Sequence, residues 1–167
     1  MNGFAYGSIA SPFGRRFCVA SDGEGLRYSG FESNERMALM RLAHDCGKRR
    51  AADTLVREAV RQARAYFGHR LRRFELPFAL TGTPFQIAVW QTVALLEAGT
   101  IVSYADVARA IGHPLAQRGV AQAMGKTPLD LFIPAHRVIG ADGRLKGAAG
   151  RMHMRRRLLA FEGIRLP

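Results

Sequence analysis

The sequence predicts an α+β protein in which a small antiparallel-sheet-plus-helix domain precedes a helical, winged-helix-like domain. Two observations carry this prediction. Apolar runs within residues 4–31 are short and separated by turn-forming residues, whereas apolar residues further along recur at three and four positions. A length of 167 residues suits one domain or two small ones. We place the boundary so that the domains span residues 1–80 and 81–167.

The first domain should begin with an antiparallel meander. Its three apolar runs are separated by two turn-rich segments, 11–14 and 22–25. The period then becomes helical over 34–46 and again over 53–67. Each of these helices is followed by a glycine that can end it, namely Gly47 and Gly68.

The second domain should begin with a capped helix. Thr83, Pro84 and Gln86 supply an N-cap, a proline in the first turn and the third residue of a capping box. Ser103 repeats this arrangement before a short helix that ends near Gly112, and a further helix is expected over 115–126. Two short helices joined by a glycine-containing turn predict a helix-turn-helix. The remainder is expected to form an extended segment (131–133), a loop (134–137) and a last helix (153–161).

The charge favours a polyanionic partner. Lysine and arginine number 25 against 13 acidic residues, which gives a net charge of +12, and only three of the cations are lysine. Both halves of the chain carry the excess, so no separate basic tail accounts for it. Arginine suits forked contacts with phosphate. With 48% hydrophobic residues the chain can bury a core, and no apolar run is long enough to span a bilayer.

Cysteine usage favours a reducing compartment. Cys18 and Cys46 are the only cysteines, too few for a disulfide framework and not at metal-ligand spacing. The amino terminus lacks the layout of a secretory signal. We therefore expect a cytoplasmic, nucleoid-associated protein with no metal site.

A resemblance to a known family rests on the run Leu131-Phe132-Ile133-Pro134-Ala135-His136-Arg137-Val138-Ile139-Gly140. It resembles the active-site loop of the O6-alkylguanine-DNA alkyltransferases, whose motif is Pro-Cys-His-Arg-Val. Other segments match the family at the same spacing and in the same order, and together they cover most of residues 82–163: Gly82 to Gln86 with Val89-Trp90, Val102-Ser103-Tyr104, Ile111-Gly112 with Pro114, Ala116 and Arg118, and Leu158 to Gly163.

One departure decides what the resemblance implies. The family's nucleophilic cysteine is Ala135 here. In the alkyltransferases that thiolate takes an alkyl group from guanine in a single irreversible turnover, without a cofactor, and a methyl side chain cannot do this. By resemblance, His136 and Glu162 are the partners that would activate the thiol through a water. An alternative of equal weight is that His136 has only a structural role, as a buried histidine that is hydrogen-bonded to Glu162.

The resemblance also assigns DNA-binding and pocket positions. Arg118 would be the finger that enters the minor groove and fills the gap left by a flipped base, and Tyr104 would push the phosphate. The small residues Ala116, Gly119 and Ala123 would let the helix approach the groove. The base pocket would comprise Thr127, Ala135, Val138 and Ala148, with the carbonyls of Ala135 and Val138 accepting from the guanine amine.

Two further departures favour a natural, non-transferring relative: Thr127 stands where the family usually has Asn, and Ala148 where it usually has Tyr. Such a monomer would flip O6-alkylguanine from duplex DNA, hold it, and mark it for another pathway such as nucleotide-excision repair. A methyltransferase with its cysteine changed to alanine is the alternative. A helix-turn-helix regulator that reads DNA sequence is the third hypothesis.

Overall fold

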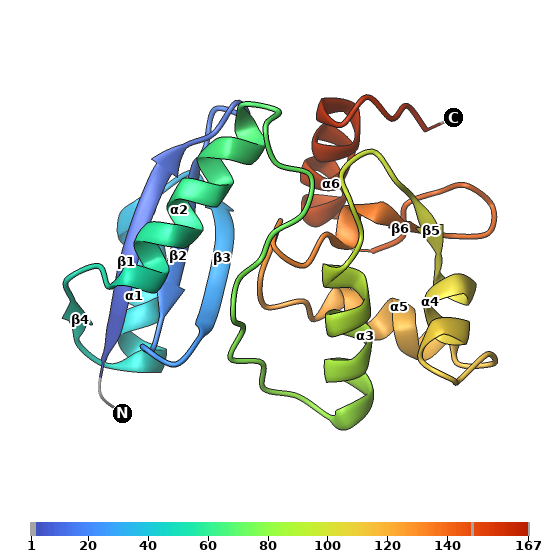
Figure 1. The fold of residues 1–167 in the computed structure, drawn as a ribbon, viewed down its shortest axis with the longest axis horizontal. Helices are drawn as coiled ribbons and strands as arrows, with labels where there is room; N and C mark the ends of the chain where they lie inside the picture. Colours follow the sequence, from blue (N-terminus) through green and yellow to red (C-terminus); the bar gives the residue numbers. More distant parts are fainter. Residues whose placement is uncertain (1–2, 148, 167) are drawn as a thin grey trace. The chain divides into compact units, whose positions relative to one another are not determined.

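The computed structural model describes residues 3–147 and 149–166, and the chain divides into two compact units. The first, which we call the sheet unit, comprises Met1–Leu80 together with Pro128–Asp130. The second, the helical unit, comprises Thr81–Thr127 and Leu131–Pro167. The segment 128–130 therefore joins the sheet unit, although a sequential division after residue 80 assigns it to the second domain. The predicted α+β class is confirmed (Figure 1).

The sheet unit is built on the predicted meander. Strands β1 (Phe4–Ala10), β2 (Arg16–Ser21) and β3 (Leu26–Glu32) pair antiparallel in sequence order. A two-residue strand, β4 (Arg49–Arg50), adds to β1 in parallel and was not predicted. Two exposed arginines carry no alternation of apolar and polar residues that could have indicated a strand.

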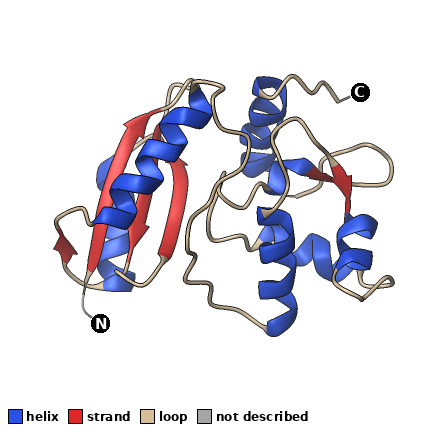
Figure 2. Ribbon diagram, viewed as in Figure 1, coloured by secondary structure: helices blue, strands red, loops and turns tan. Residues whose placement is uncertain are grey.

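Helices α1 (Glu35–Cys46) and α2 (Thr54–Phe67) cover opposite faces of this sheet. Successive side chains of β1 point to opposite faces of the sheet, so neighbouring residues of this strand contact different helices. Phe4 and Tyr6 form a core cluster with Leu42 of α1, whereas Gly7 faces α2, where an added Cβ would lie 2.7 Å from a methyl of Val56. Figure 2 shows α2 lying along the strands, as this close approach allows.

The helical unit contains α3 (Pro84–Ala94), α4 (Tyr104–Ala110), α5 (Gln117–Gly125) and α6 (Ala149–Phe161). Two short strands, β5 (Val102–Ser103) and β6 (Val138–Ile139), pair in parallel. Strand β6 directly follows the active-site-like loop, whose residues Ala135–Arg137 form a 3-10 turn. Both predicted capping boxes are confirmed: Thr83 pairs with Gln86, and Ser103 pairs with Asp106. Within the described part of the chain, no helix is both long and apolar enough to cross a membrane.

Three expectations for this unit were wrong in detail. Residues 131–133 form turns rather than a strand, with Leu131 in the left-handed region at φ 72°. All three side chains are buried. An uninterrupted apolar run predicts burial but does not distinguish an extended strand from buried turns, which is why the backbone conformation was predicted wrongly. Helix α6 begins about one turn earlier than predicted, and α5 is shorter at both ends.

Candidate base pocket and DNA interface

Ala135 opens the 3-10 turn and is held by the backbone on both sides. Its N–H donates to the carbonyl of Ile133 at 2.7 Å, and its own carbonyl accepts from the N–H of Val138. Val138 in turn pairs with Val102 through the short parallel sheet. The position of the family's nucleophile is thus fixed by main-chain contacts, and its side chain is a buried methyl group.

His136 and Glu162 form a buried hydrogen bond. The Nε2 atom lies 2.8 Å from Oε1, and both side chains are 1% exposed. Burial lowers the pKa of His136, although the carboxylate opposes this, so the imidazole is neutral at pH 7. Since Nε2 faces a carboxylate it carries the proton, which leaves Nδ1 as the basic nitrogen.

Arg137 also binds the Glu162 carboxylate. Its Nη2 and Nε atoms donate to Glu162 at 2.7 and 3.1 Å, and Nη1 donates to the carbonyl of Leu96. The backbone N–H of Gly99 donates to the other carboxylate oxygen at 3.0 Å. Burial alone would raise the pKa of Glu162, but hydrogen bonds from His136 and Arg137 hold it well below its usual range. Arg137 is thus paired with a buried carboxylate rather than exposed to DNA.

The proposed finger, Arg118, is exposed near the start of α5. Among the described residues its side chain has no hydrogen-bond or ion-pair partner. Ala116, half-buried, occupies the N-cap position two residues earlier. Gly119 faces α3, where an added Cβ would lie 3.1 Å from the ring of Phe85. A side chain at position 119 would therefore crowd the Phe85 ring where α5 packs against α3, while the adjacent Arg118 is exposed.

Other predicted positions are more buried than a DNA surface requires. Ala123 is 1% exposed and its carbonyl accepts from the indole N–H of Trp90 at 2.9 Å, so its role is packing rather than contact with DNA. Tyr104 is also buried, and burial raises the pKa of its hydroxyl. Thr127 donates to the carbonyl of Met124 at 3.0 Å. Ala148 lies outside the described residues.

Sequence reasoning missed a structural arginine in α6. Arg155, as one of three consecutive arginines with Arg156 and Arg157, has the sequence pattern of a solvated face. It is instead buried and donates to the carbonyls of Met124 and Lys146 at 2.9 and 3.3 Å. It therefore ties the end of α5 to the loop before α6. Three consecutive arginines give no indication of which one turns inward.

Cys18 is not an alternative acceptor. It is fully buried in β2, and its sulfur accepts a hydrogen bond from the Tyr6 hydroxyl at 2.9 Å. Burial raises the pKa of this thiol, so it is neutral and shielded. No cluster of three or more metal-ligating side chains occurs within the described part of the chain.

Comparison with known proteins identifies the family. A model described as "6-O-methylguanine DNA methyltransferase, DNA binding domain" matches residues 84–164. A methylated-DNA–protein-cysteine methyltransferase of Methanosarcina acetivorans is 35% identical over 164 residues, which span 95% of this chain and 97% of that protein. The chain belongs to this methyltransferase family. It is therefore a member of a DNA-repair family with a DNA-binding domain.

Solved structures of the family have the same fold. The O6-methylguanine methyltransferase of Mycobacterium tuberculosis is 32% identical, with a TM-score of 0.79 over 98% of this chain and 95% of that one. The same enzyme has been solved in complex with DNA, and that structure matches with a TM-score of 0.76 and 32% identity over 95% of this chain and 92% of the other. The likeness to the methyltransferases thus includes the sheet unit as well as the helical unit.

Proposed function

We propose that this protein binds duplex DNA containing O6-alkylguanine, turns the damaged base into a pocket beside Ala135, and holds it without removing the alkyl group. The observation that carries the proposal is the buried His136–Glu162–Arg137 arrangement next to a methyl side chain at the nucleophile position. The binding machinery of a transferase is retained, and the acceptor atom is missing.

The chemistry explains why binding would not lead to transfer. Transfer requires a thiolate that attacks the alkyl carbon while the carbon–oxygen bond to guanine breaks. Ala135 has no lone pair and no proton for Nδ1 of His136 to accept. Cys18, the cysteine whose side chain is described, is neutral and buried in the sheet unit. The complex would therefore persist until the DNA dissociates.

Ala135 has two possible origins: it is the native residue of a non-transferring relative, or it replaces the cysteine of a methyltransferase. We favour the methyltransferase whose cysteine has been replaced. This reverses the preference drawn from Thr127 and Ala148. The reversal is supported by likeness to methyltransferases across 95% of the chain and by the buried His136–Glu162 hydrogen bond. The Thr127 hydroxyl is engaged with the end of α5, so its presence can be explained by local hydrogen bonding without a change of function.

DNA would be bound through the helix-turn-helix formed by α4 and α5. Arg118 is exposed there and free to enter the minor groove, and a net charge of +12 supplies long-range attraction to phosphate. In the second candidate, a natural non-transferring relative, the held lesion would be marked for another pathway such as nucleotide-excision repair. This role places the protein on chromosomal DNA in the cytoplasm.

Binding and transfer can be separated in one assay. The protein with Ala135 should bind duplex carrying radiolabelled O6-methylguanine more tightly than unmodified duplex, and no label should remain on the denatured protein. Arg118→Ala should lose most of this preference, because nothing then fills the gap in the base stack. Arg70→Ala, an exposed arginine of the sheet unit, is the control with the same change in charge. Equal affinity for both duplexes, or label on the protein, would overturn the proposal.

A further inference from the structure

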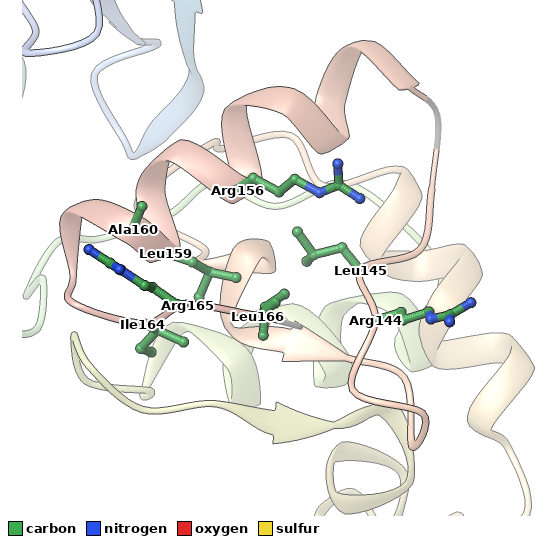
Figure 3. Close-up of a pocket in the computed structure, with 8 residues that line it drawn as sticks. All are labelled: Arg144, Leu145, Arg156, Leu159, Ala160, Ile164, Arg165 and Leu166. Atoms are coloured by element: carbon green, nitrogen blue, oxygen red, sulfur yellow. The ribbon is translucent and has the colours of Figure 1, made fainter.

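A hollow of about 670 Å³ opens on the helical unit beside the second half of α6. It lies between the loop that follows β6, the helix itself and the segment that follows the helix (Figure 3). None of the residues assigned above to the base pocket or the DNA interface lines it. The lining residues are Arg144, Leu145, Arg156, Leu159, Ala160, Ile164, Arg165 and Leu166.

The floor of the hollow is apolar. Leu145 and Leu159 are buried and belong to one core cluster with Ile139. Ile164 and Leu166 pack against this cluster and remain half-exposed toward the hollow. The floor therefore offers aliphatic surface that an incoming apolar side chain could cover, with the release of water.

The rim of the hollow is cationic. Arg144, Arg156 and Arg165 are all exposed, and in the described part of the chain none of their guanidinium groups has a hydrogen-bond or ion-pair partner. Among the residues that the structure describes, no carboxylate lines the hollow. By contrast, the buried Arg137 and Arg155 are both engaged by acceptors. Three unpaired guanidinium groups around an apolar floor indicate an anionic ligand with an apolar part.

Figure 3 shows how these charges are distributed. Arg165 lies on one side of the view and Arg144 on the other, with Leu159 and Leu166 between them. A ligand that satisfies both ends needs separated anionic groups and an apolar centre. A DNA backbone would match the cations but would leave the aliphatic floor exposed to water.

We propose that this hollow is a docking site for a short acidic segment of a partner protein. An apolar side chain of the segment covers Leu159 and Leu166, and carboxylates on either side of it pair with Arg144 and Arg165. The site does not depend on lesion binding, so this proposal and the proposed function can fail separately.

The direct test is fluorescence anisotropy with a labelled synthetic peptide that has a Leu-Phe-Leu centre and two glutamates at each end. It should bind the full chain saturably. Replacing either the central residues by serine or the glutamates by glutamine should weaken binding, because both the floor and the rim contribute. Equal binding of all three peptides, or of none, would overturn the proposal.

Protein variants locate the site. Arg144→Ala combined with Arg165→Ala should weaken the peptide complex about fivefold, as expected for two exposed ion pairs. Arg36→Ala combined with Arg70→Ala removes the same charge from exposed positions of the sheet unit and should have little effect. An equal loss in both double variants would show nonspecific attraction to a basic protein and would overturn the proposal.

Charge reversal provides a gain of binding. Arg144→Glu combined with Arg165→Glu should reject the glutamate peptide and bind its lysine counterpart, which a merely structural role of these arginines would not produce. Unmodified duplex DNA serves as a competitor. If the Arg144→Ala, Arg165→Ala variant loses as much affinity for duplex as for peptide, the hollow belongs to the DNA interface and the peptide assignment is wrong.

Discussion

Glu162 is the residue on which the geometry of the site depends most. Its carboxylate accepts hydrogen bonds from His136, from Arg137 and from the backbone of Gly99. The guanidinium of Arg137 is fully buried, so its charge is balanced only while Glu162 is ionised. One carboxylate thus orients the imidazole and neutralises a buried cation.

The first prediction follows from this charge balance. Glu162→Gln keeps the shape of the side chain but leaves the Arg137 cation uncompensated, and it should lower the free energy of unfolding by about 3 kcal/mol. Urea denaturation measures the change. Glu75→Gln breaks an exposed pair with Arg73 and should change stability by less than about 1 kcal/mol. Similar effects of the two variants would show that the buried ion pair contributes no more than a surface one.

Burial of His136 should make the stability of the protein depend on pH. Burial lowers the pKa of His136 in the folded protein, whereas the unfolded chain has an ordinary histidine near pKa 6.5. Below about pH 6.5 the unfolded state takes up a proton that the folded state does not, so stability falls as the pH falls from 7.5 to 5. His136→Gln should flatten this dependence. The exposed His153→Gln should leave it unchanged, and parallel slopes in all three proteins would contradict the buried neutral imidazole.

The role of an individual site residue could be predicted from the sequence where a family motif, or the need to pair a buried charge, applied to it. It could not be predicted elsewhere. The pairing of Arg137 with a carboxylate follows from the cost of burying an unpaired cation. The inward turn of Arg155 does not, because its neighbours Arg156 and Arg157 are chemically identical and only tertiary packing selects among them. Ala123 was assigned to the DNA surface because it is small, but small residues serve packing equally well.

At the scale of elements, the contact between α3 and α5 positions the exposed arginine of the helix-turn-helix. Gly119→Ala would place a Cβ 3.1 Å from the Phe85 ring, whereas Gly125→Ala, in the same helix, meets nothing within 4 Å. We expect Gly119→Ala to be less stable than Gly125→Ala by about 1 kcal/mol in thermal or chemical denaturation. A Phe85→Leu background should remove most of the difference. If it persists there, steric contact with Phe85 is not its cause.

Elements with explicit start and stop signals were predicted well. Helices α3 and α4 begin at capping boxes, and α1 and α2 end at glycines, because these signals act within a few residues. Strands β4, β5 and β6 have two residues each and exist only through partners distant in the chain. No local pattern specifies such strands, so they could not be predicted from the sequence.

At the scale of the whole molecule, charge should set affinity while the pocket sets lesion preference. Binding to unmodified duplex should weaken steeply with salt, with a log–log slope of about −0.9 per phosphate contacted. The affinity ratio between damaged and unmodified duplex should change little, because the base recognition proposed beside Ala135 and Val138 would use neutral groups. Binding titrations over a range of salt concentrations measure both quantities. A lesion preference that disappears with salt would show that the pocket does not discriminate.

We propose that this chain is a methyltransferase in which Ala135 has replaced the nucleophile, and the variant Ala135→Cys tests this most directly. Nδ1 of His136 is basic and its orientation is fixed by Glu162, so the new thiol should be activated. Incubation with duplex carrying labelled O6-methylguanine should then transfer one methyl group per protein to position 135, with guanine restored in the DNA. Ala135→Ser, which introduces a hydroxyl of much higher pKa, should transfer none. If the folded Ala135→Cys variant binds the lesion but acquires no label, the pocket has lost the geometry of a transferase and the account is contradicted.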